Sequence, residues 1–126
     1  MAKYVDGFVL VVPKSKIGEY KKMAQEGAEV WKKYGALDYF ECMGEDLNRK
    51  SMGGPKPLTF TKMTKAKPNE TVWFSFITFK SRKHRDEVNA RVMKAMQEKY
   101  DKNQEMQMPF DMKRMAYGGF QVEVEG

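Results

Sequence analysis

The least interrupted apolar run of the chain covers residues 72–79, VWFSFITF. This run is rich in aromatic and β-branched residues and is bounded by polar segments, a pattern typical of a strand buried on both faces. Side chains alternate between the two faces of a strand. One face therefore carries Trp73, Ser75 and Phe79, and the other carries Phe74, Phe76 and Thr78. We expect one set to pack under helices and the other to line the contact with a partner.

A second strand is predicted near the N-terminus, over residues 3–12 (KYVDGFVLVV). Both of its faces are largely apolar, and Pro13 ends it because proline lacks the N–H that a sheet ladder needs. Further strands are expected over residues 36–45 and 115–125. The Gly118–Gly119 pair in the last strand predicts a bulge or a close approach of another backbone.

Two amphipathic helices lie between these strands. Over residues 15–34, apolar side chains recur every three or four positions, and lysines and glutamates occupy the opposite face. Ser15 is expected to cap the start of this helix, and Gly35 to end it in a left-handed conformation. The second helix begins after Ser81, another N-cap, and runs to about residue 99.

The remaining segments are predicted to be mostly irregular. Residues 46–57 contain two prolines and two adjacent glycines, which favours a loop. Residues 58–66 are expected to include one short helical turn, and residues 103–110 form a second irregular stretch. The chain therefore has the order β–α–β–loop–β–α–β.

That order predicts a single α+β domain over residues 1–126. Right-handed crossovers place the first and third strands side by side at the centre of the sheet. The expected fold is ferredoxin-like, βαββαβ, with a four-stranded antiparallel sheet and both helices on one face. Because the strands are apolar on both faces, the uncovered face needs a partner. A homodimer that stacks two sheets, a dimeric α+β barrel, meets that requirement.

Composition is that of a globular chain, with 41% hydrophobic and 32% charged residues. No apolar run approaches the ~20 residues that a membrane span needs. Cys42 is the only cysteine, so no intramolecular disulfide can form, and we expect the protein in the cytoplasm. One cysteine and one histidine cannot supply a His/Cys zinc site, and no metal or cofactor is expected.

Basic residues outnumber acidic ones, giving a formal net charge of +6. They are spread over several short clusters, which is more typical of solvated helix faces than of a nucleic-acid footprint. Nucleic acid is therefore an unlikely partner, although a ferredoxin-like sheet can present stacking aromatic side chains to RNA.

Three segments carry a resemblance to a known family. They are the opening YVDGFVLVVP, the strand VWFSFITF with the KSRKHRDEVNARVM that follows it, and the closing MPFDMKRMAYGGF. Together they resemble the YbaA-like bacterial family of unknown function, domain-of-unknown-function family 1428, over nearly the whole chain. The resemblance implies a small cytoplasmic protein with the dimeric α+β barrel fold. It implies no established activity, substrate or catalytic residue.

Three residues are candidates for acid–base chemistry. Asp6 and Glu41 are carboxylates within apolar strands, and facing the barrel interior would raise their pKa values by desolvation. The alternative is a structural buried acid, paired with Arg114 or Lys113. His84 is the only histidine, at a basic helix start. It is either a general base or haem ligand at the barrel mouth, or a solvent-facing side chain.

Four residues are candidates for binding a ligand. Ser75 interrupts the central apolar strand and leaves room for a small pocket beside Trp73, whose plainer role is aromatic core. Arg114 can hold a carboxylate with two hydrogen bonds, and Tyr117 can donate to an oxyanion. Asp111 with Arg114 is equally compatible with a salt bridge that closes a loop.

These features favour a small cytoplasmic homodimer that binds a small apolar or aromatic molecule in its barrel, as a binding protein or a cofactor-free enzyme. The alternatives are a nucleic-acid-binding protein and a structural or interaction protein without a ligand. A weaker alternative is a haem-binding or haem-degrading, monooxygenase-like protein. Enzymes of that kind pair an early-strand Asn with a Trp and a His. Here Asp6 takes the place of the Asn, and Trp73 and His84 lie at roughly comparable positions.

Overall fold

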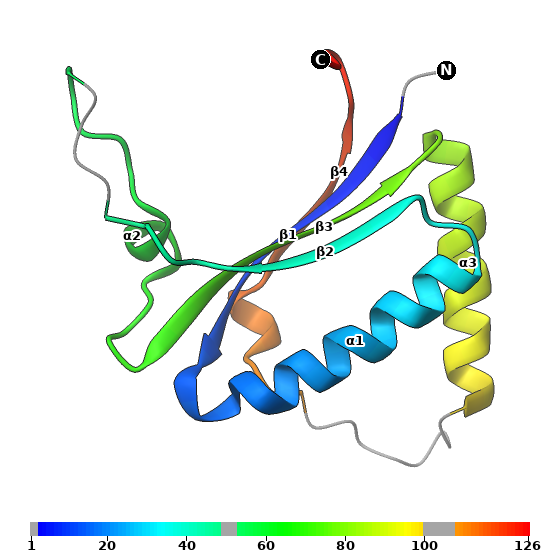
Figure 1. Cartoon of the computed structure of the whole chain (residues 1–126), viewed down its shortest axis with the longest axis horizontal. Coiled ribbons are helices and arrows are strands. Elements are labelled where there is room, and N and C mark those ends of the chain that lie inside the picture. Colours follow the sequence, from blue (N-terminus) through cyan, green and yellow to red (C-terminus); the bar gives the residue numbers. More distant parts are fainter. Residues whose placement is uncertain (1–2, 49–52, 100–107) are drawn as a thin grey trace.

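The computed structural model describes residues 3–48, 53–99 and 108–126 (Figure 1). Two short 3₁₀ helices, η1 and η2, accompany the strands and α-helices. The order of elements is β1 (Tyr4–Pro13), η1 (Lys14–Lys16), α1 (Ile17–Lys33), β2 (Asp38–Met43), α2 (Phe60–Thr64), β3 (Glu70–Phe79), α3 (Arg82–Lys99), η2 (Met112–Arg114) and β4 (Ala116–Gln121). The predicted βαββαβ order is confirmed, and α2 is the short helical turn expected in the long connection.

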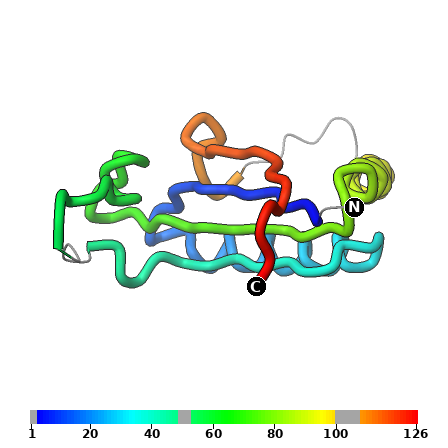
Figure 2. The backbone as a smooth tube through the Cα atoms, turned by 90° about the horizontal axis from the view of Figure 1, so that it is seen from above, coloured from blue at the N-terminus to red at the C-terminus, as the bar shows by residue number. Residues whose placement is uncertain are grey.

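The four strands form one antiparallel sheet in the order β2-β3-β1-β4, which is also their order across Figure 2. The two central strands pair along their whole lengths, from Tyr4 opposite Phe79 to Pro13 opposite Glu70. The central position predicted for the first and third strands is therefore confirmed, and the fold is ferredoxin-like α+β. Figure 1 shows α2 near the end of the sheet where β2 ends and β3 begins, on the opposite side of the molecule from α3.

The inner face of the sheet, the face covered by α1 and α3, holds the core. Alternate residues of β1 and β3 meet helix side chains there in two clusters. One contains Leu10, Val12, Tyr20, Ala24 and Trp73, and the other contains Ala36, Ile77, Phe79, Val88 and Val92. Apart from Ala36, which lies in the connection between α1 and β2, these side chains follow the periodicity of their strand or helix, and their burial removes apolar area from water.

Two of the three helix-end residues predicted from the sequence are confirmed, and one prediction was wrong. Ser81 Oγ accepts a hydrogen bond from the backbone N–H of His84 at 3.1 Å, so the predicted cap of α3 is confirmed. Gly35, with φ +115°, follows the end of α1 as expected. Ser15 as a cap was wrong, because the chain leaves β1 through η1 and α1 begins only at Ile17, with no side-chain cap.

The glycine pair of β4 permits a close approach rather than a bulge. Pairing with β1 runs without interruption from Tyr4 opposite Gln121 to Val9 opposite Ala116. A Cβ atom on Gly119 would collide with the ring of Tyr4. The predicted bulge or close approach of another backbone was therefore wrong, because the neighbour that requires a glycine at this position is the side chain of Tyr4.

The outer face of the sheet, on the side away from α1 and α3, is apolar and exposed. Phe40, Phe74 and Phe120 are 50%, 47% and 62% exposed. The ring centroid of Phe76 lies 5.2 Å from that of Phe40 and 5.7 Å from that of Phe74. A continuous aromatic surface of this kind is unusual on a protein that stays monomeric. In the described part of the chain, no helix is long and apolar enough to cross a membrane.

Candidate ligand-binding site

A cavity of about 460 Å³ lies between the inner face of the sheet and the two long helices. Its apolar lining comes from β1, β3, α1 and α3 and from the segment around η2. This lining includes Phe8, Leu10, Met23, Val30, Trp31, Ile77, Met93, Met96, Met108, Phe110, Met112 and Met115. Methionines and aromatic side chains dominate, so the wall is both apolar and adaptable. Volumes of this order are typical of small-molecule sites.

Glu41 is the most distinctive polar group of this cavity. Its Oε2 accepts hydrogen bonds from the hydroxyl of Tyr20, at 2.6 Å, and from that of Ser75. Its Oε1 accepts a third from the hydroxyl of Tyr39, at 3.0 Å. Ser75 stands directly opposite Glu41 on β3, and Tyr20 reaches it from α1. Three hydroxyl donors from three elements therefore hold one carboxylate in the wall.

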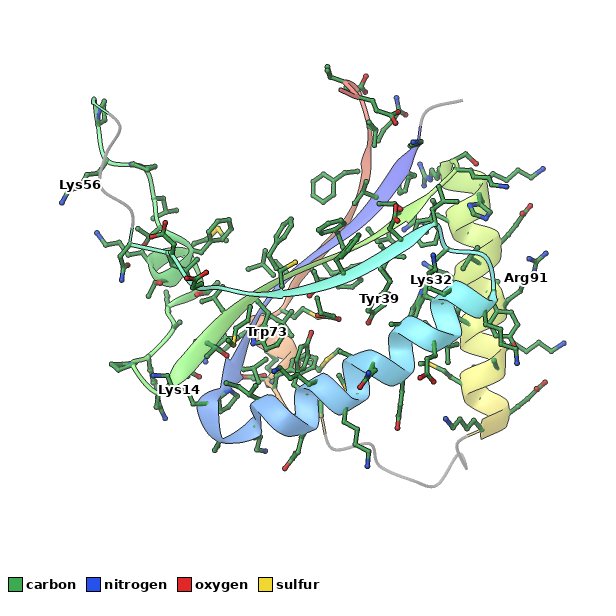
Figure 3. The ribbon with its side chains drawn as sticks, viewed as in Figure 1. Lys14, Lys32, Tyr39, Lys56, Trp73 and Arg91 are labelled. Carbon is green, nitrogen blue, oxygen red and sulfur yellow. The ribbon has the colours of Figure 1, made fainter. Side chains whose placement is uncertain are left out.

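The two tyrosines are held in their protonated form. Burial first, and then the neighbouring Glu41 carboxylate, raise the pKa of both Tyr20 and Tyr39 well above the ordinary value of 10.0. Their hydroxyls are therefore hydrogen-bond donors at any ordinary pH. Figure 3 shows Tyr39 reaching from β2 into the space toward α1.

Asp6, the other predicted carboxylate, lies on β1 and is only 1% exposed. Its Oδ1 accepts from Arg85 Nη1 at 2.9 Å and its Oδ2 from Asn89 Nδ2 at 3.3 Å. Asn89 in turn accepts from Trp31 Nε1 at 3.0 Å. Burial raises the pKa of Asp6, while the Asn89 hydrogen bond and the Arg85 charge lower it. This chain of contacts ties α1 and α3 to the sheet.

The partner predicted for Asp6 from the sequence was wrong. Arg114 instead binds Glu70 through Nη1 at 2.7 Å, and its Nη2 also donates to the backbone oxygens of Thr64 and Lys65. The reason is topological: α3 returns across the inner face and carries Arg85 over β1. Arg114 lies instead beside the end of α2, which it clamps to the start of β3. Asp111 caps η2 by accepting from the N–H of Lys113.

The other predicted site residues divide into two groups. Ser75 and Tyr117 line the cavity, and the Tyr117 ring stacks on Phe8 with centroids 4.9 Å apart. Trp73, His84 and Arg114 are not among the lining residues. Asp6, Trp73 and His84, which the haem-degrading alternative needs together, are therefore not brought to one wall.

Trp73 and His84 have structural contacts of their own. Trp73 Nε1 donates to Thr71 Oγ1 at 2.9 Å, and its ring packs edge-on against Tyr20. Figure 3 places Trp73 toward the end of the sheet where α1 begins. His84 Nδ1 accepts from the backbone N–H of Lys80 at 3.0 Å, and its ring packs against Phe79.

Sequence reasoning missed Tyr20, Tyr39, Arg85 and Asn89 as site residues. Two signals were present in the sequence. Tyr39 and Glu41 alternate on one face of a strand, and Arg85 and Asn89 are four apart on one helix face. Within the described ranges, no three His, Cys, Asp or Glu side chains come together as a metal site.

Comparisons with known proteins agree with this fold. Residues 3–112 match the model of a family described as "Protein of unknown function (DUF1428)". The chain is 41% identical over 123 residues to the uncharacterised protein YbaA of Escherichia coli strain K12, covering 98% of both chains, and equally so to that of Shigella flexneri. A crystal structure described as a dimeric ferredoxin-like protein, from an uncultured marine organism, matches over the full length of both chains, with a TM-score of 0.56 and 10% identity. The chain therefore belongs to the DUF1428 family, whose other members named here are themselves uncharacterised.

Proposed function

We propose that this protein is a cytoplasmic homodimer in which each protomer binds a small apolar or aromatic molecule between its sheet and its helices. The observation that carries the proposal is the cavity of about 460 Å³, lined by methionine and aromatic side chains, with Glu41 set in its wall. An apolar pocket with a few convergent polar groups is the usual form of a small-molecule site.

The ligand site and the dimer contact occupy opposite faces of the sheet. By strand alternation and register, Asp6, Glu41 and Ser75 face the helices, and Phe40, Phe74 and Phe120 face away from them. The binding site is therefore within one protomer, beneath its helices, rather than between two stacked sheets. Both faces can be occupied at once.

The outer face supports the homodimer. Four phenylalanine rings on three strands lie on this side, and burying them against a second copy removes a large apolar area from water. The solved ferredoxin-like neighbour is described as dimeric, which agrees with that arrangement. The exposed free thiol of Cys42 fits a reducing compartment such as the cytoplasm.

The same site can support catalysis without a cofactor. Glu41 is an acceptor held by three hydroxyls, and Tyr20 and Tyr39 serve it as hydrogen-bond donors. A bound molecule with a proton to transfer would meet this carboxylate in the cavity wall. Binding is the step that all such activities share, and it is the step to test first.

The test uses Trp31, which lines the cavity, as a reporter in a Trp73→Phe variant. Calorimetric and fluorescence titration with 2-naphthylmethanol should give saturable binding of one molecule per protomer. Val30→Phe, which adds a ring to the cavity wall, should weaken it at least tenfold. Val124→Phe, at a position 89% exposed in the C-terminal segment, should have no effect.

Two results would overturn the proposal. An absence of saturable binding by any naphthyl compound would favour a structural protein with no ligand. A monomer that binds a generic RNA with strong salt dependence would favour the nucleic-acid alternative, since the outer aromatic face would then be free for bases.

A further inference from the structure

The two carboxylates of the cavity are held by different kinds of partner. Asp6 forms an ion pair with Arg85, with side chains 2% and 14% exposed. Glu41 receives hydrogen bonds from three hydroxyls, which are neutral donors. Among residues 3–48, 53–99 and 108–126, no Lys, Arg or His forms an ion pair with it. The described residues therefore give Glu41 three neutral hydrogen-bond donors and no ion pair.

The acceptor capacity of Glu41 is not exhausted by these donors. A carboxylate has about four lone-pair positions, two on each oxygen. Oε2 takes two donors, whereas Oε1 takes only the hydroxyl of Tyr39. One position on Oε1 therefore remains for a donor on a molecule in the cavity.

The surroundings of that position suit a positive charge. The ring of Tyr39 lies beside Glu41, and the ring centroid of Trp31 is 6.1 Å from that of Tyr39. Both rings line the cavity, as do Phe8 and Tyr117. Aromatic faces attract ammonium groups, more strongly where water is excluded.

The second carboxylate does not compete for the same group. Asp6 lies two strands and two residues away from Glu41 in the register of the sheet. With about 4.8 Å between strands and about 3.3 Å per residue, their Cα atoms are about 12 Å apart. One small ammonium group can therefore pair with Glu41 or with Asp6 but not with both. Asp6 already forms an ion pair with Arg85.

We propose that the molecule bound in this cavity is a small lipophilic amine, whose ammonium group pairs with Glu41 and whose apolar or aromatic body lies among the methionines. This inference rests on the proposed function and adds the charge of the ligand to it. Flexible methionine side chains can adapt to ligands with different ring shapes. The site therefore selects a class of molecules by charge and apolar character rather than one molecule by its exact shape. Glu41 and Glu26 line the cavity without a described ion pair, whereas Asp6 is paired with Arg85, and Lys99 is the lysine of the lining.

The test compares three naphthyl compounds of nearly equal shape by isothermal titration calorimetry at neutral pH. They are 2-naphthylmethylamine, 2-naphthylmethanol and 2-naphthoic acid, which are cationic, neutral and anionic. The amine should bind at least about tenfold more tightly than the alcohol, because it adds an ion pair to the same apolar contact. The acid should bind most weakly.

Glu41→Gln should bring the affinity of the amine down to that of the alcohol and leave the alcohol within about twofold. Glu26→Gln, a matched exchange at an exposed lining residue, should leave the amine preference nearly intact. The wild-type protein gives a check that needs no variant: the preference should disappear as the pH rises through the pKa of the amine itself.

The outcomes separate the two proposals. Equal or tighter binding of the alcohol or the acid would overturn the amine assignment and keep the binding function. An amine preference that survives Glu41→Gln, or that persists when the amine is deprotonated, would also overturn it. Failure of all three compounds to bind would overturn the proposed function itself.

Discussion

The two faces of the sheet are built from the same alternating strands but have different chemistry. The inner face carries Asp6, Glu41 and Ser75 among its apolar residues, and every buried polar side chain there has a hydrogen-bond partner among the described residues. The outer face carries the exposed phenylalanines, with the hydrogen-bonded pair Thr78 and Asp38 toward one end of the strands. Buried polar groups that are fully hydrogen-bonded fix a single arrangement, whereas an open aromatic surface stabilises a contact by area alone.

The largest effect is expected from breaking the ion pair of the inner face. Asp6→Asn takes from the Arg85 guanidinium, 14% exposed, its buried partner and leaves it only the exposed carboxylate of Asp86. We expect a loss of about 3–5 kcal/mol in the free energy of unfolding, the range for breaking a buried pair on one side. Urea denaturation measures it. Asp38→Asn, at an exposed acid, is the control and should change stability by less than about 1 kcal/mol, and equal losses would contradict the account.

A charge on the outer face should break the dimer and spare the fold. Phe74→Glu places a carboxylate in the middle of the contact, where truncation of a central aromatic residue typically costs about 2–4 kcal/mol. Sedimentation should show a folded monomer. Leu58→Glu, at an apolar residue that is 69% exposed beside α2, should remain dimeric. A Phe74→Glu protein that stays dimeric would place the partner contact elsewhere.

Removing one hydroxyl from Glu41 should have a smaller effect. Tyr20→Phe deletes the 2.6 Å donor and leaves the carboxylate partly unsatisfied, which should cost about 2 kcal/mol of stability. Tyr117→Phe, on the same face, should change it by less than about 0.5 kcal/mol. Because burial and Glu41 raise the pKa of Tyr20 and Tyr39, ultraviolet titration should find both still protonated near pH 10, and Tyr20→Phe should leave the absorbance change up to that pH unaltered.

The smallest effect is expected at the Arg114–Glu70 pair, which belongs to neither the cavity nor the outer aromatic surface. Hydrogen bonds from Arg114 hold the pKa of Glu70 below its ordinary value of 4.5. The pair therefore contributes stability above that pH and loses it as the pH falls below it. We expect Arg114→Gln to lower stability by about 1 kcal/mol near neutral pH and to flatten its dependence on acid. If the stability of Arg114→Gln fell with decreasing pH as steeply as that of the wild type, this role would be contradicted.

The fold could be read from the sequence because its signals are local. The apolar run over residues 72–79, the proline after the first strand, and Ser81 and Gly35 at helix ends each fix one element without reference to the others. Strand order then followed from the handedness of the crossovers. The cap predicted at Ser15 was wrong because the 3₁₀ helix η1 intervenes between β1 and α1, and its first residue, Lys14, donates its backbone N–H to Asn69 O.

The site could be anticipated only in part, because its contacts join distant residues. Asp6, Glu41 and Ser75 were conspicuous as polar residues in apolar strands. Their partners were not: Arg85 is 79 residues from Asp6, and Tyr20 is 21 residues from Glu41. His84 and Arg114 are residue types common in active sites, but His84 accepts a hydrogen bond from the backbone N–H of Lys80 and Arg114 holds the end of α2 to the start of β3. Residue type alone does not distinguish these uses.

Native mass spectrometry of the purified protein with 2-naphthylmethylamine tests the central claim most directly, since it reads both faces of the sheet at once. The account predicts a homodimer that carries up to two amine molecules, with binding lost in Glu41→Gln and dimerisation lost in Phe74→Glu. A monomer in the wild type would contradict the role of the outer face. A dimer that takes up no amine would contradict the role assigned to Glu41 and its cavity.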